Sequence, residues 1–413
     1  MRDSPYTPGA GHSPLVLAGR DNLIVDWRSM LTDLQIDGRK RAKDLILSGP
    51  RGIGKTVLLT KFESLAAEQG FDAIPIQAVA SGRLIASLMS RADEQIRAQR
   101  GPWERAKSAL ERLGGVTLGA AGFSAGVTLN PSPQQPLPDP GMFAAALALL
   151  ANGLKSERGN GGLLITIDEL QVARGEDLAL LAATLQRLNV EHPEAPVAFA
   201  GCGLPNTSEA LREAGVTHPD RLFDLQPLTV DLDESSARFA IVEPARQRDV
   251  IWAPSAVDAI VHATHGYPAH LQLLADQTWL QADGPDIAEA DALVGVSLGE
   301  NEIKRRTLDP RWLRATDRQA ELLAAIAVSQ ESGGVGTATT QDVSRSLGKA
   351  QSEWSTVRAD LVTEGDIYAP RRGRLSFTVP TFAKYVLENY EDRRLDATVE
   401  MLTLNEMRNN NAP

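Results

Sequence analysis

The sequence predicts an α/β fold with a parallel sheet, followed by a helical unit and a smaller C-terminal unit of helices and short strands. Apolar runs at 44–48, 162–167 and 197–200 are typical of buried strands, and they alternate with segments whose apolar residues recur at helical spacing. This alternation favours a parallel sheet covered by helices on both faces. Strand signals stop near residue 231, so we expect the helical unit to begin there.

The first half of the chain supplies the sheet and the helices around it. Residues 1–18 predict a flexible lead-in, and a helix with an apolar stripe follows at 23–34. The strand at 44–48 leads through a Gly-rich loop into a helix that extends to about residue 69, and a second strand is expected at 71–77. Further helices are expected at 83–100, 103–113 and 142–154.

The segment 114–140 interrupts this pattern. Residues 114–126 are almost all small or apolar, and 130–140 is rich in proline, which excludes a regular element there. Residues 116–118 and 127–129 have the pattern of two hairpin strands. Two interpretations remain open, a surface insertion or an exposed hairpin that contacts a partner.

The C-terminal part predicts two further units. Residues 231–300 form a helical lid, and 301–392 form a winged helix-turn-helix, because three helices precede a two-stranded ribbon in this order. The helices are expected at 316–329, 340–347 and 350–364, and the strands at 367–368 and 375–379. The tail, 393–413, is expected to hold a short helix from Arg394 before a disordered tip.

Composition limits the possible functions. The 413 residues suit two or three domains, and a net charge of −11 argues against general coating of nucleic acid, although a local basic patch stays compatible with it. The single cysteine excludes an intrachain disulfide and fits a reducing compartment. Since no signal peptide or membrane span is evident, we expect a cytoplasmic protein without a membrane partner, and scattered histidines predict no structural metal.

The loop after the first strand has the spacing G-x-x-x-x-G-K-T of a phosphate-binding loop, in the residues Gly49-Pro50-Arg51-Gly52-Ile53-Gly54-Lys55-Thr56. Its glycines allow successive backbone N–H groups to point at one phosphate. Lys55 brings a positive charge to the β- and γ-phosphates, and Thr56 offers its hydroxyl to Mg²⁺. Because a strand precedes the loop and a helix follows it, the segment predicts a site for ATP and Mg²⁺.

The pair Asp168-Glu169 follows the strand at 162–167 and completes the predicted site. At the carboxyl end of a strand beside the phosphate loop, Asp168 would hold Mg²⁺, and Glu169 would activate the attacking water. Phosphoryl transfer also needs positive charge, which oligomeric ATPases take from a neighbouring subunit. Arg221, after the last expected core strand, stands where such an arginine lies; the alternative is a surface arginine paired with Asp220 or Asp224.

Three further segments make the pattern more specific. Ala18-Gly19-Arg20-Asp21 precedes the first helix, Gly266-Tyr267-Pro268 lies in the lid, and the winged-helix unit follows. Together with the phosphate loop and the Asp-Glu pair, they resemble the AAA+/STAND-like P-loop ATPases of the archaeal-ATPase and origin-recognition (initiator) group, over residues 15–390.

This resemblance implies a three-layer P-loop ATPase core at 19–230. It also implies that Arg20 lines the adenine pocket, that Pro268 contacts the base or sugar, and that Arg221 acts between subunits of a homo-oligomer. Two departures argue for slow hydrolysis. The polar sensor position holds Cys202, a weak hydrogen-bond donor, and Ala269-His270 stands where initiator-type members have an arginine.

The winged helix leaves the kind of partner open. Its third helix carries Lys349 and Arg358, and its wing carries Arg371, Arg372 and Arg374, which suit double-stranded DNA. The acidic residues Glu353, Asp360, Glu364 and Asp366 lie among them and suit protein docking better. Trp354 is expected in the core.

The sequence therefore predicts an ATP-binding, slowly hydrolysing switch whose nucleotide state controls the winged helix. The alternatives are an initiator-like DNA-binding factor with ATP as a structural ligand, and a signalling scaffold that oligomerises on a protein trigger.

Overall fold

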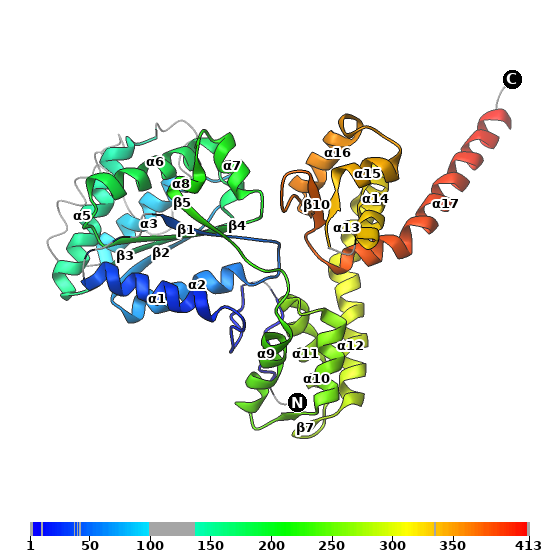
Figure 1. Cartoon of the computed structure of the whole chain (residues 1–413), viewed down its shortest axis with the longest axis horizontal. Coiled ribbons are helices and arrows are strands. Elements are labelled where there is room, and N and C mark those ends of the chain that lie inside the picture. Colours follow the sequence, from blue (N-terminus) through cyan, green and yellow to red (C-terminus); the bar gives the residue numbers. More distant parts are fainter. Residues whose placement is uncertain are drawn as a thin grey trace, which may run out of the picture. The chain divides into compact units, whose positions relative to one another are not determined.

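The computed structural model describes residues 3–9, 11–36, 38, 40, 43–98, 137–333 and 336–410. They form two compact units (Figure 1). Unit 1 comprises Met1–Pro8, Pro50–Gly52 and Ala245–Pro413, and unit 2 comprises Gly9–Gly49 and Ile53–Pro244. The expected helix at 103–113 and the expected hairpin of the insertion lie outside the described residues.

Unit 2 is built on a five-stranded parallel sheet in the order β2-β3-β4-β1-β5. The strands are β1 (Asp44–Ser48), β2 (Phe71–Gln77), β3 (Gly162–Asp168), β4 (Val197–Gly203) and β5 (Phe223–Pro227). The first four confirm the sequence prediction. The fifth strand was not expected, because only Phe223 of its five residues is buried. Since β5 begins after Arg221, this arginine precedes the last core strand instead of following it.

Helices cover both faces of this sheet, as the alternating pattern predicts. They are α1 (Asp21–Ile36), α2 (Lys55–Glu68), α3 (Leu84–Ala98), α5 (Pro140–Arg158), α6 (Gly175–Glu191), α7 (Thr207–Glu213) and α8 (Pro219–Leu222). Figure 1 shows α1 and α2 on one face and α6 on the other. Buried side chains of α3, α5 and α6 form one core cluster with the strands, whereas Trp27 of α1 stacks on Phe62 of α2 at 4.5 Å.

Polar contacts mark where two of these helices begin. Asp139 accepts hydrogen bonds from the N–H groups of Gly141 and Met142 and so caps α5. The buried carboxylate of Asp177, on α6, accepts from the N–H of Leu84 at 3.0 Å and so caps α3. The first cap is local to α5, whereas the second joins α6 to α3.

Unit 1 begins with a helical part. Its elements are β6 (Ile251–Trp252), α10 (Pro254–Thr264), α11 (Pro268–Gln281), β7 (Asp286–Ile287), α12 (Glu289–Ile303), the π-helix Lys304–Leu308 and α13 (Asp309–Arg314); α9 (Glu234–Arg246) leads into it. The two-residue strands β6 and β7 pair in parallel, a detail without a sequence signal. Gly295 allows α12 to approach α11 closely, since a Cβ atom there would lie 2.5 Å from the backbone nitrogen of Thr278.

The N-terminal segment differs from the expected flexible lead-in at Tyr6. This side chain is 3% exposed, and its ring meets Trp252 at 6.1 Å and Trp279 at 6.0 Å, edge to face. The N–H of Thr7 also donates to Gln272 Oε1 at 3.1 Å. Residues 6 and 7 are therefore part of the core of unit 1, because two distant tryptophans provide a place for Tyr6.

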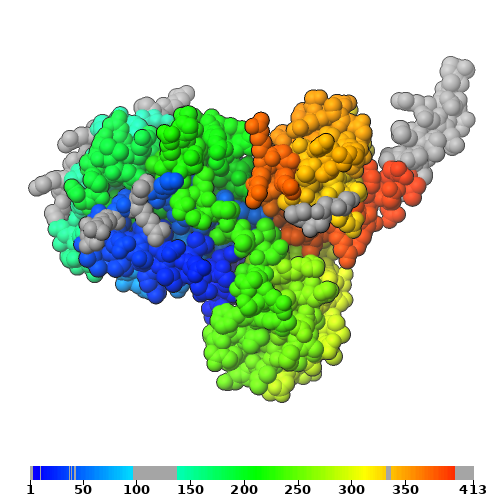
Figure 2. Space-filling view, in the orientation of Figure 1, coloured from blue at the N-terminus to red at the C-terminus, as the bar shows by residue number. Residues whose placement is uncertain are grey.

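The C-terminal part of unit 1 has three helices and three short strands. It contains α14 (Asp317–Gly333), β8 (Ala338–Thr339), α15 (Thr340–Leu347), α16 (Gln351–Thr363), β9 (Ile367–Tyr368), β10 (Arg374–Phe377) and α17 (Thr381–Asn410). The sheet order is β8-β10-β9, so one strand joins the expected ribbon. The turn between β9 and β10 lies at the surface (Figure 2, orange). The expected short helix from Arg394 is instead part of the 30-residue α17.

Among the residues that the structure describes, none of the helices combines the length and apolarity that a membrane span requires.

Candidate nucleotide site

The phosphate loop connects β1 to α2 at the carboxyl edge of the sheet. Gly54 adopts a left-handed conformation with φ 90°, and α2 begins at the next residue. No side chain caps this helix start and its first turn contains no acidic residue, which suits an anion at the helix N-terminus. Lys55 is 7% exposed, and its ammonium group donates to the carbonyl of Gly49 at 2.8 Å.

Two predicted residues from different elements, Thr56 and Cys202, donate hydrogen bonds to Asp168. The hydroxyl of Thr56 donates to Asp168 Oδ2 at 2.7 Å, and the thiol of Cys202 donates to Asp168 Oδ1 at 2.8 Å. Burial and the nearby Asp168 carboxylate raise the pKa of the Cys202 thiol, so the thiol keeps its proton and remains a donor. The structure thus brings together the loop, the end of β3 and the end of β4.

The oxygen atoms of Thr56 and Asp168 fit a magnesium ion. Mg²⁺ prefers hard oxygen ligands, and with a nucleotide it uses one or two protein groups and completes its shell with phosphate oxygens and water. A hydroxyl and a carboxylate 2.7 Å apart match that need. The described residues contain no cluster of three or more His, Cys, Asp or Glu side chains, so a cage made of protein ligands alone is not found among them.

Glu169 begins the turn that follows β3. Its backbone is left-handed, with φ 55° and ψ 40°, which is uncommon for a residue other than glycine. The N–H of Glu169 donates to Asp168 Oδ1 at 2.7 Å. Its carboxylate accepts a hydrogen bond from the side-chain amide of Gln171. The amide oxygen of Gln171 accepts from the N–H of Leu204 at 2.9 Å.

Two residues of this region carry no sequence signal that would have identified them. Gln171 lies in the short 3-10 helix Leu170–Val172, and only its contacts with Glu169 and Leu204 distinguish it. Glu63 of α2 accepts a hydrogen bond from the hydroxyl of Thr166 at 2.5 Å, and burial, with a smaller effect of Asp168, raises the pKa of its carboxyl group. Neither Gln171 nor Glu63 can be identified as a site residue unless its tertiary contacts are known.

Arg20 and Arg221 have different surroundings within unit 2. Arg20 is 8% exposed, and its guanidinium donates to the hydroxyl and carbonyl of Thr229 at 2.9 and 3.1 Å and to the carbonyl of Ile53 at 3.4 Å. Arg20 therefore supports the phosphate loop, and its predicted role beside adenine stays a prediction. Arg221 lies in the one-turn helix α8 with its side chain exposed, as contact with another subunit requires.

The tip of the phosphate loop, Pro50–Gly52, belongs to unit 1. There the hydroxyl of Tyr267 donates to the carbonyl of Arg51, and the N–H of Ala269 donates to the carbonyl of Gly52 at 3.1 Å. Pro268 starts α11 between these two donors. His270 packs its ring edge-on against Tyr267 at 4.6 Å, and burial lowers its pKa to about 4, so it is uncharged at neutral pH.

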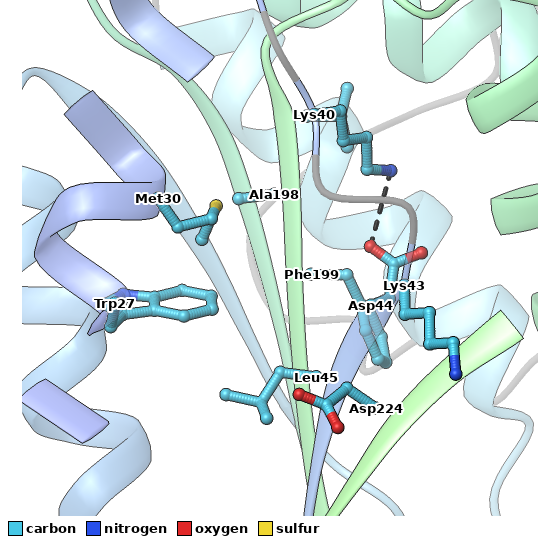
Figure 3. Close-up of a pocket in the computed structure, with 10 residues that line it drawn as sticks. Trp27, Met30, Lys40, Lys43, Asp44, Leu45, Ala198, Phe199 and Asp224 are labelled. Atoms are coloured by element: carbon cyan, nitrogen blue, oxygen red, sulfur yellow. Dashed lines mark ion pairs between the residues drawn. The ribbon is translucent and has the colours of Figure 1, made fainter. Parts of the chain in front are cut away.

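A small pocket in unit 2 lies at the opposite, amino-terminal ends of the strands (Figure 3). Lys40 and Asp44 face each other there, with 3.4 Å between Nζ and Oδ1 and side chains only 8% and 3% exposed. Burial raises the pKa of Asp44 above its usual value. Because β1 separates this pair from the phosphate loop, we assign it to anchoring the start of β1.

The residues predicted to contact DNA or a protein partner differ in how exposed they are. Arg371 and Arg372 are exposed, whereas Arg374 is half-buried and donates to the hydroxyl of Thr337 at 2.7 Å. Arg358 is half-buried and its Nε has no hydrogen-bond partner in the described part of the chain, and Lys349 pairs with Glu321 at 2.7 Å. Trp354 is 3% exposed and in the core, as predicted.

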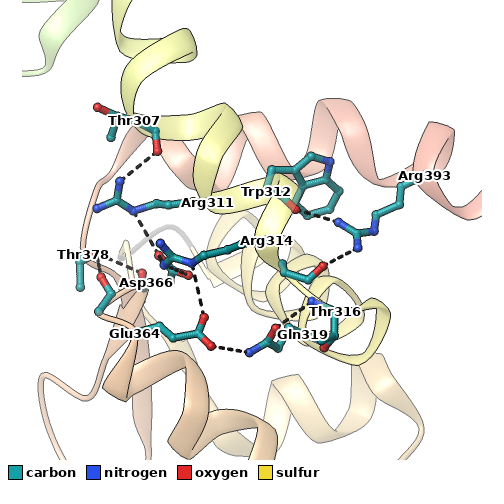
Figure 4. A network of polar contacts seen from close by, with 12 residues as sticks. Thr307, Arg311, Trp312, Arg314, Thr316, Gln319, Glu364, Asp366, Thr378 and Arg393 are labelled. Atoms are coloured by element: carbon teal, nitrogen blue, oxygen red, sulfur yellow. Dashed lines mark hydrogen bonds and ion pairs between the residues drawn. The ribbon is translucent and has the colours of Figure 1, made fainter.

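A network of ion pairs fixes α13 to the start of β9 (Figure 4). Arg314 donates to both oxygens of Asp366 at 2.6 and 2.7 Å, and Arg311 lies 3.1 Å from the same carboxylate. The Asp366 side chain is fully buried, and this burial raises its pKa although both arginines oppose the shift. Asp366 is therefore a structural residue and not part of an exposed contact surface.

Comparison with known families supports the prediction of an ATPase core. Residues 16–199 match the AAA ATPase domain, and residues 305–386 match a domain of unknown function, DUF8462. A search of curated protein sequences finds no significant match.

Solved structures match the chain over nearly its whole length. The ORC2 protein of Aeropyrum pernix, determined as ADPNP-ADP complexes, has a TM-score of 0.57 and 14% identity, covering 95% of this chain and 98% of that chain. A Walker-type ATPase of Pyrococcus abyssi has a TM-score of 0.51 and 16% identity, covering 90% of this chain and 96% of that chain. The chain thus shares its fold with these two proteins.

Proposed function

We propose that this protein is an ATP-binding AAA+ switch that hydrolyses ATP slowly, and that its nucleotide state controls which partner its C-terminal part contacts. The observation that carries this proposal is the meeting of Thr56, Cys202 and Asp168 within hydrogen-bond distance beside the start of α2. Together with Lys55, these groups suit a metal-bound nucleotide phosphate, because they combine a helix N-terminus, a lysine and hard oxygen atoms.

The residues support hydrolysis by positioning and charge compensation. Lys55 would offset charge on the β- and γ-phosphates, and Thr56 with Asp168 would hold Mg²⁺, which neutralises phosphate charge when it is bound. The Glu169 carboxylate would orient the attacking water and accept its proton. We expect slow turnover because the sensor position holds Cys202, a weak donor, and because Ala269-His270 stands where initiator-type ATPases have an arginine.

ATP hydrolysis by the purified protein tests this proposal. We expect steady-state turnover that disappears in Glu169→Gln, which controls for contaminating enzymes, and ATP binding that disappears in Lys55→Ala. Lys61→Ala, a change of another lysine on α2, serves as the matched control and should leave binding unchanged. Wild-type affinity in Lys55→Ala would reject the assignment of the nucleotide site.

Exchange of subunits tests the role of Arg221. If Arg221 completes the site of a neighbouring copy, Arg221→Ala and Glu169→Gln should each be inactive alone, because one lacks the arginine and the other lacks the base. An equimolar mixture should regain turnover, since Glu169→Gln subunits can lend Arg221 to intact sites. No recovery in mixed assemblies would leave Arg221 as a surface residue.

The surface of α16 favours a protein as the partner of the switch. Its exposed positions are Gln351, Ser352, Ser355, Thr356, Ala359 and Thr363, together with the acidic Glu353 and Asp360. Phosphate contacts need local positive charge, and this face provides little. Light scattering with ATP and Mg²⁺ should then show assembly that duplex DNA does not change, as expected for a signalling scaffold.

Double-stranded DNA is the second candidate, and the exposed pair Arg371 and Arg372 in the surface turn favours it. In that case ATP acts as a structural ligand of an initiator-like factor, or DNA raises its turnover. Turnover measured with and without duplex DNA at physiological salt distinguishes the candidates. Charge reversal of Arg371 and Arg372 should abolish a DNA complex and leave ATP binding intact.

A further inference from the structure

We propose that Gln171 is a positioning residue for hydrolysis. Its side-chain amide fixes the carboxylate of Glu169 to the end of β4 and so sets the rate of hydrolysis without changing nucleotide affinity. This inference rests on the proposed function, because it assigns a role within the same site. All the groups involved belong to unit 2.

The two partners of Gln171 determine how its amide is oriented. The Glu169 carboxylate can only accept a hydrogen bond, and the N–H of Leu204 can only donate one. The amide nitrogen must therefore face Glu169 Oε2, at 2.5 Å, and the amide oxygen must face Leu204 N, at 2.9 Å. Gln171 is thus a bridge of fixed polarity between the carboxylate and the backbone of the segment that follows β4.

The end of β4 leaves room for the turn that carries Gln171. A Cβ atom at Gly203 would lie 2.5 Å from Gln171 Oε1, and a Cβ atom at Gly201 would lie 2.4 Å from Leu170 Cδ1. Both glycines therefore allow residues 170 and 171 to pack directly on the strand. This packing joins Glu169 to the same strand that carries Cys202.

The turn itself leaves Glu169 little freedom. Its left-handed backbone is held by its own N–H, which donates to Asp168, and by its carbonyl, which accepts from the N–H of Val172 at 3.0 Å. The side-chain carboxylate of Glu169 is restrained separately, by the hydrogen bond from the Gln171 amide. Gln171 thus holds the carboxylate in one place, as alignment with an attacking water requires.

Two near-isosteric variants test the inference. Gln171→Met fills the same space without either hydrogen bond, and we expect kcat to fall about tenfold while KM and the Kd for ATP stay within about twofold of wild type. Gln171→Glu keeps an acceptor for Leu204 but places a second carboxylate beside Glu169. Repulsion between the two carboxylates should displace that of Glu169, so we expect kcat to fall at least as far as in Gln171→Met, again with the Kd for ATP within about twofold of wild type.

Gln226→Met is the matched control, because Gln226 is also half-buried in unit 2 and also donates to a carboxylate, that of Asp224. It should leave kcat, KM and the Kd for ATP unchanged. Wild-type kcat in Gln171→Met or in Gln171→Glu would overturn the role of Gln171 alone. If the wild-type protein binds ATP but shows no turnover above Glu169→Gln, both the proposed hydrolysis and this role are rejected.

Discussion

The hydroxyl of Thr56 donates a 2.7 Å hydrogen bond to the carboxylate of Asp168, which joins the first turn of α2 to the end of β3. The two residues are 112 positions apart in the chain, and each belongs to a different local motif, the phosphate loop and the Asp-Glu pair. Their contact converts two separate sequence signals into one candidate metal site.

Replacement of Thr56 should affect ATP binding only when Mg²⁺ is present. In Thr56→Val the hydroxyl is lost at nearly constant volume, so we expect the Mg²⁺-dependent part of ATP affinity to weaken about tenfold. Thr56→Ser retains the hydroxyl and should bind as wild type. Calorimetric titrations with Mg²⁺ and with EDTA measure the difference; equal weakening under both conditions would place Thr56 outside the metal site.

Cys202 should influence turnover through Asp168. Cys202→Ser supplies a stronger donor at the same position, and we expect turnover to be equal to wild type or higher. Cys202→Ala removes the donor, and turnover should fall by about three- to tenfold. Single-turnover hydrolysis of radiolabelled ATP, with affinity determined separately, checks both. Identical rates in the serine and alanine variants would contradict the prediction.

Gly295→Ala should destabilise unit 1. The added Cβ atom would lie 2.2 Å from the hydroxyl oxygen of Thr278 and 2.5 Å from its backbone nitrogen, so α11 and α12 must separate. We expect a loss of about 1–3 kcal/mol in the free energy of unfolding, measured by urea denaturation. Gly175→Ala is the control, since its Cβ atom meets only Ala214 at 3.6 Å, an ordinary contact, and should not lower stability.

Stability should decrease in mild acid because of His270. Burial lowers its folded-state pKa to about 4, against 6.5 for the unfolded chain. The unfolded state therefore binds the proton first, and stability is fully present above pH 6.5 and is lost as the pH falls towards 4, by about 2–3 kcal/mol.

Denaturation midpoints from pH 7.5 to 4.5 measure this effect. His270→Phe keeps an aromatic ring against Tyr267 without a titrating group, and it should show a shallower loss than wild type. A change at the exposed His218, such as His218→Gln, should leave the wild-type slope in place. Parallel curves for wild type and His270→Phe would argue against a buried neutral His270.

The parts that could be predicted from sequence are those whose signal is local. The phosphate loop, its flanking strand and helix, and Asp168 at the end of β3 each lie within a few residues, and the structure has them as expected. The helices of the C-terminal part are likewise close to their predicted ranges, because their apolar spacing is regular. These elements account for the fold class and for most of the candidate site.

The parts that could not be predicted depend on distant partners. β5 has a polar edge-strand sequence and is recognisable only by its pairing with β1. Tyr6 is an ordinary residue of a Pro- and Gly-containing segment until Trp252 and Trp279 surround it. Gln171 is distinguished only by its contacts with Glu169 and with the N–H of Leu204, which lies 33 positions away. In each case the stabilising contact lies outside any window of local sequence.

The burial of Tyr6 has a consequence for biosynthesis. Residues 4–8 leave the ribosome well before Trp252 and Trp279, whereas Gly9–Gly49 and Ile53–Pro244 emerge in time to complete unit 2. Unit 2 can thus fold during translation, while Tyr6 remains exposed until Trp252 and Trp279 have been synthesised. The part of unit 1 that is translated earliest therefore stays exposed until residues 252–279 have been synthesised, and nascent chains arrested before residue 252 should expose it to chaperones or proteases.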